Sequence, residues 1–474
     1  MDDSWVNSGQ RIGADLHLEL GRDGSRRAAL ITALREAVRD GRLAPGSRLP
    51  PYRSLAADLG LARNTVSQAY AELVAEGWLT ARQGSGTRVA ERVDPPSAVR
   101  TARPATRRTA PHLLLSGQPD ASAFPRAAWL AAARRAVQAA PAEAFGPGDP
   151  RGRIELRRAV AEYLARARGV RTDPERIVVC AGFAAGMRLL YPGGGGGVLR
   201  GALAVEEYGL PFHRQLLAAV GVPTRVLTVD QHGAAVGELV GMEDAGAVLL
   251  TPAHQFPTGG PLHPERRLAA VDWARARDAV VLEDDYDGDF RYDRQPVGAV
   301  QGLDPERVVY LGSVSKSLSP ALRIGWLVLP DHLVDPVLAA KGEREGFTGV
   351  VDQLTLAAFL ESGDYDRHLR RMRQRYRERR DELVAALAER APQVTVTGIA
   401  AGLHAVLRLP AGTEPATLRA ARWHGVALFG LASFRHPEAV GPTPDGLVVG
   451  YAAPPDHGWR AALAALCEVL PEAD

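Results

Sequence analysis

Short β-rich runs alternate with helical stretches between residues 112 and 474, and this alternation constrains the fold more than any other feature of the sequence. The runs are apolar, as strands buried on both faces are, and they lie at 177–180, 247–251, 279–282, 308–311 and 326–329. Strands that alternate with helices build an α/β fold with a mainly parallel central sheet. Residues 365–390 predict one long helix dense in arginine, and the patterns beyond about 391 predict a smaller α+β lobe.

Residues 26–90 follow a different pattern, which predicts a small helical unit. Apolar residues recur at helical spacing in 27–39, in 54–59 and again from residue 64, and glycines end each segment. Two short extended segments, 78–82 and 87–90, are joined by the turn-forming letters QGSG. Three helices followed by a hairpin are the plan of a winged helix-turn-helix domain, which we place at residues 15–90.

The third predicted helix of this unit begins with side chains that can read DNA. In helix-turn-helix domains the start of that helix reaches base edges in the major groove. There Arg63 can pair with guanine and Asn64 with adenine. Arg53, at the start of the second helix, is suited to a phosphate, and the glycines of the hairpin let the backbone approach a duplex. A small protein-interaction domain is the alternative interpretation of this unit.

Residues 91–111 combine prolines and arginines with few apolar side chains, so they cannot bury a core. We expect a semi-flexible basic linker there, which leaves residues 112–474 as the third part of the chain. The net charge of +2 neither requires nor excludes a nucleic-acid partner.

The composition excludes two classes of protein. No run approaches the ~18 apolar residues of a membrane helix, so no membrane partner is expected. Cys180 and Cys467 are the only cysteines, which rules out a disulfide framework and favours a reducing compartment, the cytoplasm.

Lysine is nearly absent from the chain. Of the 57 basic residues only Lys316 and Lys341 are lysines, and the others are arginines. Arginine replaces lysine in charge, but only lysine can lose its proton and attack a carbonyl carbon. A lysine that remains is therefore a candidate for Schiff-base chemistry, with an ordinary surface lysine as the alternative.

Three blocks of the α/β part carry chemistry, and each directly follows a predicted strand. The blocks are GSVSK at 312–316 with Arg323 beyond it, EDDY at 283–286 and TPAHQFPTG at 251–259. Ligands of parallel sheets bind beyond the carboxyl ends of the strands. A lysine there can bond a carbonyl cofactor, while hydroxyls and an arginine bind its phosphate. A carboxylate can keep a pyridine nitrogen protonated, and a phenol can bond a ring hydroxyl.

These motifs resemble two known families. LPPYRSLA at 49–56, ARNTV at 62–66 and QGSGT at 83–87 closely resemble the DNA-binding domain of GntR-type transcription regulators. The three blocks of the α/β part, in this order, resemble the pyridoxal-phosphate site of fold-type-I aminotransferases. The combination resembles the MocR subfamily of GntR regulators over nearly the whole chain.

The resemblance implies a role for each matching residue. Lys316 forms a Schiff base with pyridoxal 5′-phosphate (PLP), Asp284 faces its pyridine nitrogen, and Tyr286 its 3-hydroxyl. The phosphate is held by Ser313, Ser315 and Arg323 near Gly182, and Phe183 is placed to cover the ring. His254 either contacts the cofactor or bonds the strand end, and Asp285 is a structural or exposed carboxylate. The DNA-contacting residues are Arg53, Arg63, Asn64, Thr65, Ser85 and Gly86.

The sequence departs from the family in two places. The phosphate-binding turn reads CAGFAA at 180–185, without hydroxyl or amide side chains, although backbone N–H groups at the helix start can still bind phosphate. The family's EDPGY element reads EEYGL at 206–210, so its tyrosine is either replaced by Leu210 or displaced to Tyr208. Aminotransferases also bind the substrate carboxylate through an arginine of the small lobe, for which Arg435 is our candidate.

The sequence leads to one function and two alternatives. We expect a transcription regulator that binds operator DNA, acts as a head-to-tail homodimer, and senses PLP or an amine or amino acid at Lys316. One alternative is an active aminotransferase with an accessory DNA-binding head, and the other is a regulator that no longer binds the cofactor. The arginines of 367–380 form either a second DNA surface or, as we favour, the solvated face of a helix that bridges the lobes.

Overall fold

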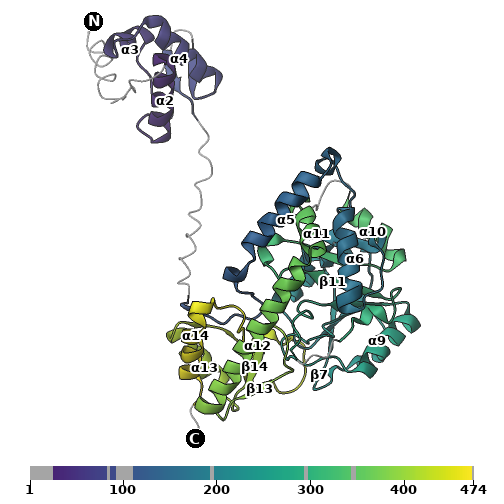
Figure 1. The fold of residues 1–474 in the computed structure, drawn as a ribbon. Coiled ribbons are helices and arrows are strands. Elements are labelled where there is room, and N and C mark those ends of the chain that lie inside the picture. Colours follow the sequence, from purple (N-terminus) through teal and green to yellow (C-terminus); the bar gives the residue numbers. More distant parts are fainter. Residues whose placement is uncertain are drawn as a thin grey trace. The chain divides into compact units, whose positions relative to one another are not determined.

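The structure is a computed structural model that describes residues 25–82, 86–91, 110–192, 197–292, 297–342 and 348–471. It divides into two compact units, Met1–Arg108 and Thr109–Asp474 (Figure 1). Ser85 of the predicted wing, and residues 92–109 of the predicted linker, lie outside the described residues.

The first unit contains three helices and a hairpin. The helices are α2 (Arg26–Arg39), α3 (Tyr52–Asp58) and α4 (Arg63–Ala75), and β1 (Leu79–Arg82) pairs antiparallel with β2 (Gly86–Val89). Helix α3 begins two residues before the predicted start, directly after Pro50 and Pro51. One face of each helix is buried in a common core, which includes Leu34, Leu55, Val66 and Leu73. The order of elements is that of a winged helix-turn-helix.

The second unit is built on a seven-stranded sheet with the order β4-β12-β11-β10-β9-β5-β6. Only β12 runs antiparallel to its neighbours, so the predicted mainly parallel sheet is confirmed. The strands are β4 (Ile177–Cys180), β5 (Ala202–Glu206), β6 (Thr224–Leu227), β9 (Ala245–Leu250), β10 (Val280–Asp284), β11 (Val308–Ser313) and β12 (Gly325–Val328). The prediction lacked β5, which is rich in alanine, and β6, which lies at the sheet edge.

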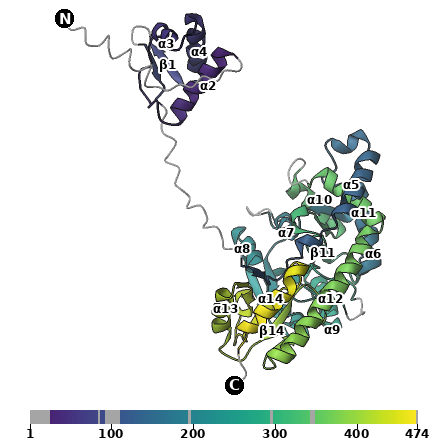
Figure 2. The same cartoon turned by 60° about the vertical axis from the view of Figure 1, so that its left-hand side comes forward.

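Helices cover both faces of this sheet (Figures 1 and 2). On one face α7 (Phe183–Leu190), α8 (Pro211–Ala219) and α10 (Asp331–Lys341) share a core with alternate residues of the strands. The other face packs on α6 (Ile154–Arg168), α9 (Pro264–Arg277), α11 (Val350–Glu361) and the long α12 (Asp364–Arg390). Helix α5 (Arg126–Ala139) lies along α11. The result is a three-layer α/β/α arrangement.

A smaller lobe follows α12, as predicted. Its four-stranded sheet has the order β13-β14-β17-β16 and its neighbouring strands run antiparallel. The strands are β13 (Thr395–Thr397), β14 (Ala405–Arg408), β16 (Phe429–Gly430) and β17 (Gly446–Val449), and the helices are α13 (Glu414–Trp423) and α14 (Asp456–Val469). A short parallel pair joins β15 (Val426–Ala427) to β3 (His112–Leu113). The start of the second unit is thereby tied to the small lobe.

Two glycines bring the turn after β4 against β12. Gly182 precedes α7 with φ +91°, a backbone conformation that favours glycine. A Cβ atom on Gly325 would lie 2.7 Å from the Cα atom of Gly182. The start of α7 can therefore lie directly beside the end of β11 and the first residue of β12, where the predicted phosphate site is.

Among the helices of the described residues, none is both long and apolar enough to span a membrane.

Candidate functional site

The exposed face of α4 carries the side chains that the sequence assigns to base recognition. Arg63 and Asn64 are exposed on its first turn, and Thr65 is half-buried. No side chain caps this end of the helix, so its first N–H groups are open to a ligand. On the opposite face Val66, Ala69, Tyr70 and Leu73 are buried, which fixes the direction in which the exposed face points.

Two further contacts set the surroundings of α4. The Tyr70 hydroxyl donates a 3.0 Å hydrogen bond to the carbonyl oxygen of Pro50 and so ties α4 to the start of α3. There Arg53 is exposed, with its guanidinium 5.9 Å from the ring centre of Tyr52. Gly86, at the start of β2, has φ +79° and lies against the side chain of Arg48. Arg48 precedes α3 and pairs with Arg88 of β2, so it is a basic residue beside the hairpin that the sequence motifs did not indicate.

The same face of α4 continues beyond the predicted residues. Ser67 and Gln68 are exposed one turn after Arg63 and Asn64. Residues four apart lie on one face of a helix, so helical periodicity alone could have included both in the predicted set. They extend the candidate DNA-reading surface to about two turns.

The second unit contains a cavity of about 280 Å³ at the carboxyl ends of β10 and β11. The predicted cofactor residues in its wall are Gly182, Phe183, Asp284, Tyr286, Ser313, Ser315, Lys316 and Arg323. His254 does not line the cavity but lies behind Tyr286, within hydrogen-bond distance of its hydroxyl. Residues separated by up to 141 positions of sequence are thus brought to one site by the sheet.

Lys316 follows β11 and reaches into this cavity. Its Nζ donates a 2.5 Å hydrogen bond to the carbonyl oxygen of Gly117. Burial lowers the pKa of Lys316, while the carboxylates of Asp284 and Asp287 oppose the shift. A lowered pKa increases the neutral fraction of the amine, which is the form that attacks a carbonyl carbon. Lys341, in contrast, is buried and donates 2.6 Å hydrogen bonds to the carbonyl oxygens of Pro150 and Val179.

Asp284 is the last residue of β10, and its carboxyl group lines the cavity. Within the described residues it has neither a hydrogen bond nor an ion pair, although it is only 9% exposed. Burial, followed by the charge of Asp285, raises its pKa well above the usual range. The charge of Lys316 opposes this shift. A buried carboxyl group without a hydrogen-bond or ion-pair partner among the described residues fits the protonated ring nitrogen of a pyridine cofactor.

The neighbouring Asp285 has a structural role, as the sequence indicated. Its Oδ2 lies 2.6 Å from Nε of Arg168 and accepts a 2.7 Å hydrogen bond from Tyr310. Both charged side chains are almost fully buried. Their pairing ties α6 to the end of β10, so that Asp284 and not Asp285 faces the cavity, whose wall also includes Glu206.

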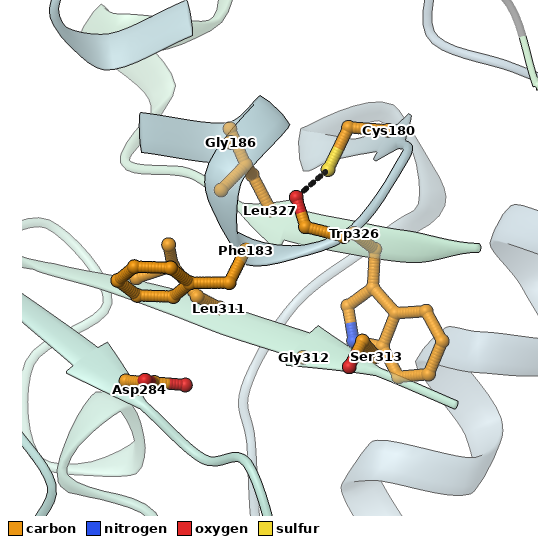
Figure 3. Close-up of a pocket in the computed structure, with 10 residues that line it drawn as sticks. Cys180, Phe183, Gly186, Asp284, Leu311, Gly312, Ser313, Trp326 and Leu327 are labelled. Atoms are coloured by element: carbon orange, nitrogen blue, oxygen red, sulfur yellow. Dashed lines mark hydrogen bonds between the residues drawn. The ribbon is translucent and has the colours of Figure 1, made fainter. Parts of the chain in front are cut away.

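The hydroxyls and the arginine predicted for the phosphate surround the end of β11. The backbone N–H of Ser315 donates a 3.4 Å hydrogen bond to Oγ of Ser313. Arg323 has φ +53°, a left-handed conformation that costs a non-glycine residue about 1–3 kcal/mol and is concentrated at functional sites. A smaller pocket shares Asp284, Phe183 and Ser313 with the cavity, and Figure 3 shows these side chains around it. The dashed line in Figure 3 is the hydrogen bond from Sγ of Cys180 to the carbonyl oxygen of Gly182.

Phe183 and His213 form a stacked pair in the cavity wall. Their ring centres are 4.1 Å apart and their planes differ by 23°. Burial, followed by the charges of Lys316 and Arg214, lowers the pKa of His213 to about 3. The imidazole is therefore neutral at physiological pH and adds an uncharged aromatic ring to the cavity wall.

Arg435 does not line the cavity. Its Nε donates a 2.7 Å hydrogen bond to Glu207, and its two terminal nitrogens donate to Thr443 and to the carbonyl oxygens of Val440 and Gly441. These partners engage all three nitrogens, so the guanidinium holds a loop of the small lobe. The sequence context of Arg435 gave no sign of Glu207, which lies 228 positions away.

Arg214, which sequence reasoning did not single out, does line the cavity. It is half-buried on the first turns of α8, and its Nη1 donates to the carbonyl oxygens of Gly209 and Phe434. Within the described residues no carboxylate pairs with it, and burial lowers its pKa. It is therefore a cation at the cavity without a counter-ion.

Comparison with known proteins defines the class of the chain. Residues 27–89 match the gntR family of bacterial regulatory proteins, and residues 113–443 match aminotransferase class I and II. The chain is 34% identical to the pyridoxine biosynthesis regulator PdxR of Corynebacterium glutamicum, over 80% of this chain and 82% of that protein. It is 33% identical to the probable rhizopine catabolism regulator MocR of Rhizobium meliloti, over 89% of each chain.

The second unit also has relatives among solved structures. The kynurenine aminotransferase of Pyrococcus horikoshii, solved in complex with PMP, superposes with a TM-score of 0.67 at 23% identity, over 75% of this chain and 90% of that one. At this identity the match shows the fold, which is the predicted aminotransferase fold. The molecule is thus a DNA-binding transcription regulator whose second unit has the fold of an aminotransferase. The chain belongs to the MocR subfamily of GntR-type transcription regulators.

Replacement of Arg63 by alanine tests the DNA-reading face. We expect Arg63→Ala to weaken binding to a specific site by about 1–3 kcal/mol and to relax base preference at one position, because a bidentate contact to a base edge is lost. The matched control is Arg27→Ala, since Arg27 is exposed on α2 and pairs with Glu72. Fluorescence anisotropy with a set of single-base variants measures both effects, and an unchanged base preference would refute the role of Arg63.

Replacement of Asp284 by alanine tests the carboxyl group of the cavity. Charged hydrogen bonds contribute about 1.5–3 kcal/mol, so we expect Asp284→Ala to weaken PLP binding roughly 10- to 100-fold and to shift the visible absorption of the bound cofactor. The exposed Asp331, replaced by asparagine, is the control. A titration followed by absorbance measures both quantities. Wild-type affinity and spectrum in Asp284→Ala would show that another group faces the ring nitrogen.

Proposed function

We propose that the second unit binds PLP through Lys316 and that occupancy of this site, by PLP or by an amine bound to it, changes the affinity of the first unit for operator DNA. The single observation that supports this most strongly is the convergence of Lys316, Asp284, Tyr286 and Arg323 on one cavity. These residues come from the end of β10 and from the segments that follow β10 and β11, and they offer the amine, carboxyl, phenol and guanidinium groups that one such cofactor requires.

In this proposal each residue acts on a stated part of the cofactor. Lys316 provides the amine, Asp284 holds the ring nitrogen in its protonated form, and Ser313, Ser315 and Arg323 bind the phosphate. When bound, PLP supplies an aldehyde that bonds a primary amine and a ring that withdraws electrons from that bond. The stacked, uncharged rings of Phe183 and His213 cover one side of the cavity.

The altered phosphate turn remains compatible with this proposal. Although the turn lacks hydroxyl and amide side chains, Gly182 and Phe183 line the cavity at the start of α7. The backbone N–H groups at a helix start bind phosphate well, and no side chain caps this one. These groups support binding of the cofactor over the alternative of a regulator that has lost it.

Arg214 points to the chemical class of an effector. Since Arg323 is assigned to the phosphate and Lys316 to the aldehyde, Arg214 is the cation of the cavity wall that remains without a partner anion. We infer that it binds the acidic group of an amino acid whose amine reacts at Lys316. Its terminal nitrogens suit a planar carboxylate.

The cavity favours a regulator over an active aminotransferase. Among the described residues, none of the arginines in the cavity wall comes from the small lobe, because Arg435 is engaged elsewhere. In an aminotransferase Arg214 would have to orient the carboxylates of both amino-acid partners in turn, without the small-lobe arginine that such enzymes use. A regulator needs only that the ligand binds one conformation better than the other.

We further propose that the protein acts in the cytoplasm, where its DNA is, as a homodimer with the chains arranged head to tail. Aminotransferase-like folds are typically dimeric, and α5 supports such an assembly. Leu130 on this helix is 67% exposed and Val137 is 40% exposed, with Phe145 just beyond it at 50%. Large apolar side chains that lie exposed together mark an interaction surface.

DNA-binding measurements on the full chain test the function. An operator is selected from a random-sequence DNA pool, and its affinity is measured by anisotropy without ligand, with PLP, and with PLP plus β-alanine or ethylamine. We expect a change of about 5- to 150-fold with one of these ligands, the usual range of coupling between two sites. In Lys316→Ala the change should be absent. An affinity that no ligand alters would contradict the proposal.

Two further measurements test the role of Arg214 and the alternative of an active aminotransferase. Arg214→Gln should weaken the response to β-alanine, leave PLP affinity unchanged and leave any response to ethylamine unchanged, with Arg188→Gln on the exposed side of α7 as the control. Loss of PLP affinity in Arg214→Gln would instead assign this residue to the phosphate. Sustained keto-acid production from two amino-acid partners would favour the aminotransferase.

A further inference from the structure

A second cavity lies between α6 and α12, and it shares no lining residue with the cavity that contains Lys316. Its volume of about 340 Å³ is typical of a small-molecule site. Two aspartates and five arginines line it within the described residues, and the arginines are Arg166, Arg168, Arg291, Arg370 and Arg373. The wall of this cavity, which we call the arginine cavity, therefore carries an excess of positive charge.

Both aspartates of the arginine cavity already have partners. Oδ2 of Asp366 lies 2.9 Å from Nη2 of Arg166. Asp289 accepts a hydrogen bond at each carboxylate oxygen, from the hydroxyl of Tyr163 at 2.5 Å and from that of Tyr365 at 3.3 Å. Among the described residues of the wall there is no third carboxylate, so the excess of arginine is not balanced from within.

Two of the five arginines hold the wall itself. Arg168 pairs with Asp285, and its Nη1 donates a 3.3 Å hydrogen bond to the carbonyl oxygen of Gly288. Nη1 of Arg291 lies 3.4 Å from the carbonyl oxygen of Ala253. These contacts fix the chain that follows β10, which forms one side of the arginine cavity.

Arg370 and Arg373 are the cations that the wall leaves for a ligand. They stand three positions apart on α12 and therefore lie on one face of the helix. Arg370 is exposed and has neither a hydrogen bond nor an ion pair among the described residues. Arg373 is half-buried, and within the same residues only its Nε is engaged, by the carbonyl oxygen of Asp289 at 2.5 Å. The terminal nitrogens of both side chains remain available.

Arg166 faces this pair from the opposite helix. Only its Nη2 is engaged by Asp366, and its guanidinium carbon lies 5.7 Å from the ring centre of Tyr163. The ring and the carboxylate hold the guanidinium at the wall while its other nitrogens stay unbound among the described residues. Three partly or wholly unused guanidinium groups thus converge from α6 and α12.

The helix that carries Arg370 and Arg373 is fixed from its inner side. Nε2 of His368 donates a 2.8 Å hydrogen bond to the carbonyl oxygen of Ser317, and the Tyr365 hydroxyl lies 2.8 Å from Oγ of the same serine. Both side chains are buried. A helix anchored in this way presents its two arginines without a further ordering of the backbone, which favours ligand binding.

Three guanidinium groups suit a phosphate better than a carboxylate. A carboxylate has two oxygens, and a single arginine can bind both of them. A phosphate monoester has three terminal oxygens and a charge of about −1.5 to −2, so it can accept hydrogen bonds from several arginines at once. A solvated helix face would not need a cavity beside these side chains.

We propose that the arginine cavity is a second ligand site, which binds the phosphate group of a small phosphorylated molecule through Arg166, Arg370 and Arg373. This inference goes beyond the proposed function, because the site requires neither Lys316 nor PLP. The volume of the cavity leaves room for the organic part of such a ligand beside its phosphate.

Calorimetric titration of the full chain with glycerol 3-phosphate at low ionic strength tests the site. Since a hydrogen bond between charged groups contributes about 1.5–3 kcal/mol, we expect Arg370→Gln to weaken binding roughly 10- to 100-fold. The matched control is Arg371→Gln, which removes the same charge from the next, exposed position of α12 outside the cavity wall. It should bind as the wild type does. Because Arg370 has no partner among the described residues, its replacement should leave thermal unfolding unchanged.

Three results would overturn the proposal. One is the absence of saturable binding in the wild type, or an equal loss in Arg370→Gln and Arg371→Gln. Another is a loss in Arg323→Gln without one in Arg370→Gln, which would place the phosphate in the cavity of Lys316. The third is tighter binding of succinate than of glycerol 3-phosphate, which would make the ligand a carboxylate. Glycerol, which lacks the phosphate, should not bind.

The phosphodiesters of DNA offer related chemistry, and a separate measurement distinguishes them. If a DNA phosphate occupied the arginine cavity, the slope of log affinity for the selected operator against log salt concentration would fall by about one in Arg370→Gln. We expect the same slope in the wild type, in Arg370→Gln and in Arg371→Gln. A slope reduced in Arg370→Gln alone would make this cavity a DNA contact and overturn its assignment to a small molecule. Failure of PLP to bind would refute the proposed function and leave these measurements unaffected.

Discussion

The parallel pairing of β10 with β11 is the constraint on which the candidate site depends. Its register sets Asp284 opposite Leu311, two residues before the end of β11. Asp284 and the turn that carries Lys316 therefore lie at the same edge of the sheet. The antiparallel β12 then returns beside β11 and brings Gly325 against Gly182 at the start of α7. A carboxylate, an amine and a phosphate-binding turn thus meet without any of them being near the others in sequence.

Two buried carboxylates near this edge of the sheet are each paired with an arginine. Arg168 neutralises Asp285, and Arg435 neutralises Glu207. Asp284 and Arg214 line the cavity without such partners among the described residues. A buried polar or charged group without a partner is costly, so in our proposal a ligand with both a cationic and an anionic group would stabilise the cavity. Linkage makes such a ligand a natural regulator, since whatever binds one arrangement better shifts the protein toward it.

The sequence predicted the parts of the site that are encoded locally. Lys316, Asp284 and the start of α4 each stand in a short motif beside a strand or helix whose pattern is clear, and the structure places them at the expected ends. The sequence could not predict contacts between distant segments. Arg214 reaches the cavity because α8 packs beside it, and Arg435 is engaged by Glu207 from another lobe.

The most direct test of this account is borohydride reduction of the purified full chain with PLP, followed by peptide mass mapping. The chain has only two lysines, so Lys341 is an internal control, buried and bonded to two carbonyl oxygens. The account predicts a visible absorption band that is lost in Lys316→Ala, and a reduced cofactor adduct on the peptide that contains Lys316. An adduct on Lys341, or no band and no adduct in the wild type, would contradict it.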